Sequence, residues 1–187
     1  MEGAGVERTT GRPASVANLW SLYRGYFEES AAEFLLPVEY LLATALTESS
    51  GNPLALRKEP GYLDDDSTPN KISPGLMQTL LSTAQTTLSS KVTREWLFHP
   101  ENSIRAGAAY IRSLAPRSFL DGPMVFASYN AGGIYQQNGL KNRWKIRQYP
   151  IGTGEHCDRA IKWFNDAVFV ISLETVKYNW QWFLGSI

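Results

Sequence analysis

Apolar side chains recur along this chain at steps of three and four residues, the spacing of one helical face. The first such run follows Ser15, a residue type that caps helix starts, and the second follows Pro37, which suits an opening turn. Further helices are predicted over 75–88, from Pro100 onward, over 124–131 and over 155–176. No convincing alternating run predicts a strand. The pattern predicts a mainly α fold.

One segment, residues 52–74, interrupts the helical pattern. It contains four prolines and the acidic run Asp64-Asp65-Asp66, and it reads as a long loop. Loops of this length inside compact domains are often functional, so a lid or a groove wall is one interpretation. A plain solvated insertion is the other.

Composition limits the class of protein. A length of 187 residues predicts one globular domain, which we assign to 15–187. The N-terminus over 1–14 is expected to be flexible. The 18 basic and 18 acidic side chains cancel, so no general attraction to nucleic acid or anionic lipid is expected. Cys157 is the only cysteine, which excludes an internal disulfide.

No targeting or membrane segment is predicted. Residues 1–15 lack the apolar core of a secretory signal. The best candidate for a membrane span, 167–173, is far too short. We therefore expect a soluble protein, without a membrane span, that is made in the cytoplasm.

Glu48 is the candidate catalytic residue. It lies in the last turn of the helix that follows Pro37, and Leu41, Leu42 and Ala45 precede it by seven, six and three residues. This spacing places the carboxyl on or beside the apolar face, where partial desolvation would raise its pKa, as a glycosidase acid requires. The alternative is a glutamate at the edge of the face, turned to water and chemically idle.

Four blocks in order decide between these interpretations. Together they resemble the soluble lytic transglycosylase family, which shares a lysozyme-like core with goose-type lysozymes; they are Ala45 to Pro53, Ser73 to Gln78, Pro100 to Gly107 and Ala127 to Gly132. The resemblance covers roughly residues 36–135. It implies a lysozyme-like α-helical domain with a long active-site loop.

The resemblance also implies roles for single residues. Glu48 would be the catalytic acid and base. Met77 and Gln78 would contact substrate beside the scissile bond, with Ser73 as a similar candidate. The resemblance places Tyr129 and Asn130 near the acid, although a helix stop and a core tyrosine explain the same two residues.

A second glutamate is often found in the family near the start of a later helix. Glu155 resembles it, but extra residues separate it from Pro150. Glu155 is thus a candidate groove residue for substrate binding. A carboxylate favoured by the helix dipole is the alternative.

The chain departs from the family pattern in two places. His99 stands where an aspartate is common before Pro100, which affects only a helix cap. The acidic loop is longer than is typical, so Asp64, Asp65 or Asp66 could position a water, as supporting aspartates do in goose-type enzymes. No aspartate follows Gln78 directly, so that goose-type feature is missing.

Metal-dependent and nucleophilic chemistry find little support. His99 and His156 are far apart in sequence and no zinc-binding motif is present. The run His156-Cys157-Asp158 cannot direct all three side chains to one point on a helix, which favours a surface cluster. We expect no metal and no organic cofactor.

Two aromatic segments are open to interpretation. Residues 135–149 interleave basic and aromatic side chains, which could border a glycan groove or form a solvated loop. The tail carries Tyr178, Trp180, Trp182 and Phe183. It is expected to dock onto the domain, because exposed rings would be a liability.

The expected activity is non-hydrolytic cleavage of the β-1,4 bond between N-acetylmuramic acid and N-acetylglucosamine of bacterial peptidoglycan, leaving 1,6-anhydromuramic ends. The alternatives are a muramidase that uses an Asp64–Asp66 carboxylate and water, and a non-catalytic wall-binding or virion structural module. A monomer is expected. A wall-cutting domain without an export signal suggests a phage lysis or virion-associated enzyme, or an effector secreted by a dedicated machine.

Overall fold

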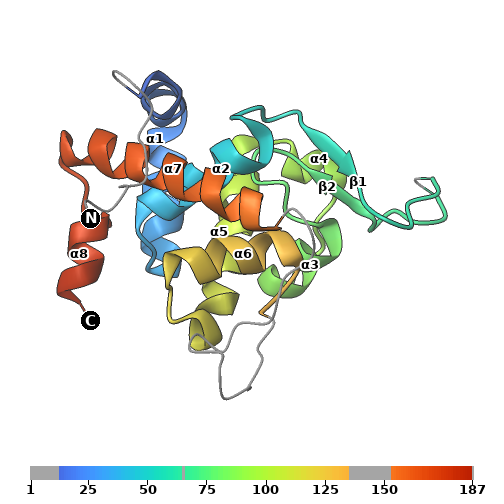
Figure 1. Cartoon of the computed structure of the whole chain (residues 1–187). Coiled ribbons are helices and arrows are strands. Elements are labelled where there is room, and N and C mark those ends of the chain that lie inside the picture. Colours follow the sequence, from blue (N-terminus) through green and yellow to red (C-terminus); the bar gives the residue numbers. More distant parts are fainter. Residues whose placement is uncertain (1–12, 65, 135–152, 187) are drawn as a thin grey trace, which may run out of the picture.

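The computed structural model describes residues 13–64, 66–134 and 153–186. In these ranges the chain forms eight helices and one two-stranded sheet, so the prediction of a mainly α fold is confirmed (Figure 1). The helices are α1 Ala14–Phe34, α2 Val38–Ser49, α3 Leu81–Leu88, α4 Arg94–Leu97, α5 Pro100–Ser118, α6 Gly122–Ala131, α7 Thr153–Ser172 and α8 Trp180–Gly185. The expected N-terminal segment lies almost wholly outside the described residues.

α2 is the central helix, and its burial follows from the helices around it. It packs against α1, α5 and α7, and α7 crosses it in Figure 1. Every residue from Val38 to Thr47 is buried. This buried part of the helix therefore cannot move without disturbing the core, which fixes the backbone of Glu48 in its last turn.

Two predicted helix starts were wrong. α1 begins at Ala14 after Pro13, so Ser15 lies in the first turn and does not cap it. The helix predicted from Gly75 begins only at Leu81. The intervening backbone has positive φ at Gly75 (85°) and Gln78 (47°), a conformation that a right-handed helix excludes.

The segment predicted as a loop contains a β-hairpin. β1 Leu56–Lys58 pairs antiparallel with β2 Ile72–Pro74, in the register Arg57 opposite Ser73. The prediction of no strand was wrong because neither strand alternates: β1 is exposed throughout and β2 is buried throughout. The hairpin projects from the body of the domain (Figure 1).

A close approach between α5 and the turn that follows the hairpin depends on a small residue. A Cβ on Gly107 would lie 2.6 Å from Cε of Met77. Gly107 belongs to a run of small residues, 106–109, which lets the turn that carries Met77 pack closely against α5.

The aromatic tail docks onto the domain, which confirms the prediction. The Trp180 ring packs edge-on against Tyr40 of α2 and Phe164 of α7, with centroids 5.7 and 5.2 Å apart. The backbone N–H of Trp180 donates to Oε1 of the buried Glu39 at 2.9 Å. Burial raises the pKa of Glu39 to about 7.

Gly75 and Gly61 share a φ of 85° but differ in surroundings, so they separate steric clash from backbone strain. A Cβ on Gly75 would lie 2.0 Å from the carbonyl oxygen of Leu97, whereas one on Gly61 meets nothing within 4 Å. We predict that Gly61→Ala costs about 1–2 kcal/mol in the free energy of unfolding, and that Gly75→Ala costs clearly more. Urea unfolding of both variants measures the difference, and equal losses would contradict the clash.

Glu39 predicts a pH dependence of stability. An unfolded glutamate releases its proton near its ordinary pKa of 4.5, whereas the folded Glu39 keeps it up to about pH 7. The folded state thus binds more protons between these values, and stability falls as pH rises through the window. A shift of this size corresponds to a loss of about 3 kcal/mol.

We predict that Glu39→Gln, which mimics the protonated form, removes most of this fall between pH 5 and pH 8. Urea unfolding across this range is the measurement, with the exposed Glu95→Gln as control. A wild-type protein equally stable at both pH values would refute the buried titration.

Candidate active site

Glu48 is held at the end of α2 with little access to water. The helix ends at Ser49 because Ser50, the C-cap, takes the left-handed conformation with φ of 55°. Only 5% of the Glu48 side chain is exposed. The predicted placement beside the apolar face is confirmed.

The partner of Glu48 comes from α7. Oε1 of Glu48 lies 2.9 Å from Nε2 of His156, and 8% of the histidine side chain is exposed. The interpretation of His156 as part of a surface cluster was wrong, because the first turns of α7 direct it inward. Nδ1 of His156 is buried and has no hydrogen-bond partner within the described residues.

The next residue, Ser49, ties α2 to the turn after the hairpin. Its hydroxyl donates to the carbonyl oxygen of Leu76 at 2.7 Å and also lies 3.0 Å from that of Ala45. In the same turn, the N–H of Met77 donates to Oγ of Ser103 on α5 at 2.9 Å. These bonds fix the Gly-Leu-Met-Gln turn against the acid's helix.

Tyr129 of α6 supports the same turn, and it interacts electrostatically with Glu48. Its hydroxyl donates to the Met77 carbonyl oxygen at 2.9 Å and lies 2.8 Å from Oγ1 of Thr79. Burial, with the nearby charge of Glu48 as the next cause, raises the Tyr129 pKa well above its ordinary value. The structure therefore brings Tyr129 near Glu48. The hydroxyl of Tyr129 forms its hydrogen bonds with Met77 and Thr79.

A polar pocket of about 180 Å³ collects most of the predicted binding residues. Ser73, Gln78, Tyr129 and Asn130 line it, together with residues of the hairpin, α3 and α5. The side-chain amide of Gln78 donates to the carbonyl oxygens of Ala55 and Gly75, at 3.0 and 2.8 Å. Gln78 thus shapes the pocket while it holds the hairpin in place.

A second carboxylate, Glu59, also lines this pocket. Its Oε1 accepts from Ser73 Oγ at 2.5 Å and from Arg57 Nε at 2.7 Å. The Glu59 side chain is 17% exposed, and the positive charge of Arg57 compensates its own. Glu59 was not predicted from the sequence, because only the folded hairpin brings it across from Ser73.

Met77, Glu155 and the acidic run lie elsewhere. Met77 is fully buried against Gly107, so its evident role is packing. Glu155 is exposed in the first turn of α7, one residue from His156. Their predicted contacts with substrate stay predictions.

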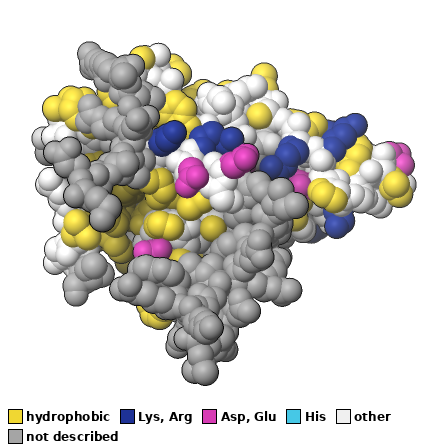
Figure 2. Space-filling view, viewed as in Figure 1, with side chains coloured by type: hydrophobic (Ala, Val, Ile, Leu, Met, Phe, Trp, Pro, Cys, Tyr) yellow, Lys and Arg dark blue, Asp and Glu magenta, His cyan; other side chains and the backbone are white. Residues whose placement is uncertain are grey.

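Asp64 and Asp66 are exposed in the loop that joins the two strands; Asp65 lies outside the described residues. Asp64 stabilises its own turn, because its carboxylate accepts from the backbone N–H groups of Asp66 and Ser67 at 3.1 and 2.6 Å. Figure 2 shows acidic side chains at the far end of the projecting hairpin, and acidic and basic side chains mixed across the middle of the same face.

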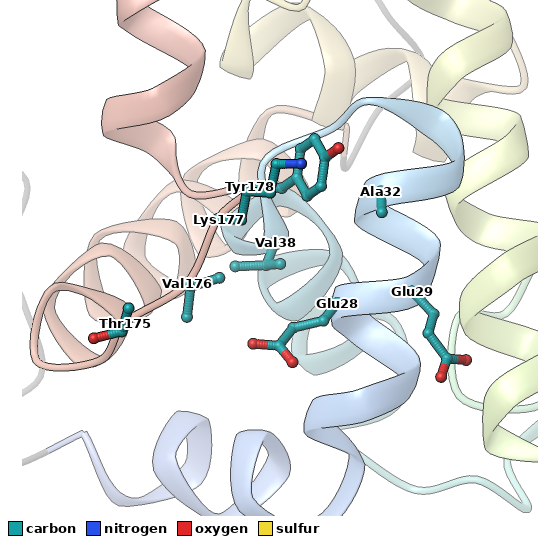
Figure 3. Close-up of a pocket in the computed structure, with 8 residues that line it drawn as sticks. All are labelled: Glu28, Glu29, Ala32, Val38, Thr175, Val176, Lys177 and Tyr178. Atoms are coloured by element: carbon teal, nitrogen blue, oxygen red, sulfur yellow. The ribbon is translucent and has the colours of Figure 1, made fainter.

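A larger pocket lies apart from this site. It measures about 540 Å³ and lies between α1 and the segment before α8 (Figure 3). Glu28 and Glu29 come from α1, and Lys177 and Tyr178 from the opposite wall. None of the predicted site residues lines this larger pocket.

Metal sites and membrane spans each have requirements that the described residues do not meet. No cluster of three histidine, cysteine or carboxylate side chains among them is arranged to hold a metal ion. No helix in the described ranges is both long and apolar enough to cross a membrane. The basic and aromatic segment 135–149, considered as a groove border, lies outside the described residues.

A helical domain with a nearly buried glutamate at the end of its central helix, and with a hairpin on the wall of a polar pocket, has the architecture of the lysozyme-like class. Within that class, the chain belongs to the transglycosylase SLT domain family, whose model matches residues 25–149. The resemblance drawn from the four blocks is confirmed.

Solved and curated proteins agree. The fold is similar to an inactive mutant of lytic transglycosylase Slt from Pseudomonas aeruginosa, with a TM-score of 0.61 and 18% identity over 86% of this chain and 26% of that one. The membrane-bound lytic murein transglycosylases C of Yersinia pestis (strain Pestoides F) and Yersinia pseudotuberculosis serotype O:1b (strain IP 31758) are 32% identical over 59% of the chain. The matched part spans 31% of those relatives.

The inward direction of His156 was not predicted, although the sequence carries a signal for it. His156 precedes the buried Ala160, Ala167 and Ile171 by 4, 11 and 15 residues, the steps of one helical face. Extending this buried face of α7 by one turn toward the N-terminus would have predicted an inward histidine. Its pairing with Glu48 could not be predicted, since 108 residues separate them.

Proposed function

We propose that this domain is a peptidoglycan lytic transglycosylase that cleaves the β-1,4 bond between N-acetylmuramic acid and N-acetylglucosamine. The observation that carries the proposal is the position of Glu48. Glu48 lies in the last turn of the buried helix α2, and its charge acts on Tyr129, which lines the polar pocket together with Ser73 and Gln78. The relatives are named lytic murein transglycosylases, which supports murein as the substrate of this site.

The reaction needs one carboxyl group for two proton transfers. Protonated Glu48 gives its proton to the glycosidic oxygen as the bond from C1 of muramic acid breaks. The resulting carboxylate then accepts the proton of the muramic C6 hydroxyl, whose oxygen bonds to C1 and closes the 1,6-anhydro ring. Water is not consumed, and the tethered hydroxyl gains from proximity what a second catalytic carboxylate would otherwise supply.

The muramidase alternative needs a carboxylate that holds water. Asp64 already accepts three hydrogen bonds within its own turn, and Glu59 is bonded to Ser73 and Arg57. Both arrangements support structural roles for these carboxylates and thus favour the anhydro route. A non-catalytic module is disfavoured because it would not need a buried glutamate paired with His156.

The biological setting is part of the same proposal. The domain acts on bacterial cell-wall glycan strands, as a monomer and without metal or organic cofactor. Nucleic acid is not a partner, since the formal charge of the chain is zero. A phage lysis or virion-associated enzyme, made in the cytoplasm, is the setting that we infer.

We predict that Glu48→Gln keeps the fold and lowers glycan cleavage by at least about a hundredfold, because the amide can neither donate nor recover the proton. Release of muropeptides from purified sacculi, measured by mass spectrometry, gives the rate. The exposed Glu95→Gln is the matched control and should cleave normally. A folded Glu48→Gln protein with more than about a tenth of wild-type activity would sink the assignment.

Replacing Asp64, Asp65 and Asp66 together by asparagine tests the product. An asparagine side-chain oxygen in place of the Asp64 carboxylate can still accept the two turn N–H bonds, so the hairpin loop should keep its shape. We predict anhydro ends in both proteins and less than about a tenfold loss of rate. Reducing muramic ends in the wild-type digest, with a dead triple variant, would reverse the choice in favour of a hydrolase.

A further inference from the structure

Within the described residues, the side chain of Glu48 forms a hydrogen bond with the imidazole ring of His156. Nε2 of His156 lies 2.9 Å from Oε1, a full hydrogen bond between two nearly buried side chains. A buried polar contact of this kind fixes the direction of both groups, because neither can turn to water instead. Because Oε1 is the oxygen that bonds to His156, Oε2 is the oxygen that we assign to the proton transfer.

Within the described residues, the polar contact of the His156 ring is its bond to Glu48. Its Nδ1 is buried without a partner within the described residues, so the bond to Glu48 is the polar contact that orients the ring. A bare, neutral Nδ1 is less costly to bury than a charged imidazolium with an unpaired N–H. The geometry is therefore consistent with the tautomer that carries its proton on Nε2 and donates it to the carboxylate.

We propose that His156 is a positioning residue for Glu48, an inference that rests on the proposed function. The Nε2–H group holds Oε1 and stabilises the carboxylate that forms when Oε2 gives its proton to the leaving oxygen. Oε2 then recovers a proton from the C6 hydroxyl. His156 keeps its own proton throughout, so the step balances with no other reactant.

The placement of His156 explains how the acid is aimed. Glu48 lies at the end of its helix, where only its backbone is fixed by α2. A glutamate has three side-chain torsions, and without a partner it would sample several directions. The bond from α7 restricts it to one, which is what proximity catalysis requires.

Substitutions at His156 test this role with a matched pair. In glutamine the amide Nε2 can donate from about the position of the histidine Nε2, whereas leucine fills similar volume without a donor. We expect His156→Leu to lower kcat on soluble glycan strands by about tenfold or more with little change in KM. His156→Gln should recover most of that loss. The same changes at the exposed His99 are the controls and should leave both constants unchanged.

Two measurements do not depend on turnover. Strand binding by Glu48→Gln and by the Glu48→Gln, His156→Leu double variant should agree within about twofold, since the role lies in the chemical step. The protein has two histidines, so nitrogen NMR resolves them readily. The Nε2–H signal of His156 should shift when Glu48 is replaced by glutamine.

The outcomes separate the two ideas. A wild-type protein that leaves glycan strands intact refutes the proposed function and, with it, this role. A wild-type protein that cleaves, together with a folded His156→Leu that cleaves as fast or faster, refutes the positioning role alone; faster cleavage would identify His156 as an inhibitory cover. Equal losses in the two His156 variants would also overturn it, because they would indicate packing.

Discussion

The backbone of one short turn, at Leu76 and Met77, is the constraint on which the rest of the site depends. Side chains from three helices hold it: Ser49 of α2, Ser103 of α5 and Tyr129 of α6. A turn buried among helices cannot exchange these bonds for water, so each backbone group must find a partner in the protein. The positions of α2, the pocket wall and the hairpin are therefore all fixed relative to this one turn.

This constraint also explains which parts of the family pattern are structural. Ser49 follows the acid because its hydroxyl must reach Leu76 from the end of α2. Gly75 begins the turn because a Cβ there would strike the Leu97 carbonyl. Gln78 ends it by bonding back to the hairpin. The resemblance identified these residues as substrate contacts or motif positions, whereas the structure gives most of them a hydrogen-bonding role within the fold.

The sequence predicted the helical class, the place of Glu48 and the docking of the tail, because each depends on local periodicity or on an apolar face that must be buried. It did not predict the hairpin. Strands of three residues, one wholly exposed and one wholly buried, carry no alternation. The sequence also did not predict the contact between His156 and Glu48. This contact depends on how α7 packs across α2 and not on neighbours in the chain.

The opposite directions of Glu155 and His156 show why an aligned residue type is weaker evidence than a helical face. Successive residues on a helix differ in direction by about 100°. If residue 156 faces Glu48, residue 155 faces away, and it is exposed. The chemistry changes with the direction. Two carboxylates in contact would repel unless one held a proton, whereas a neutral imidazole can donate to an ionised Glu48 without that penalty. A histidine at this position therefore allows the acid to be buried in both of its protonation states.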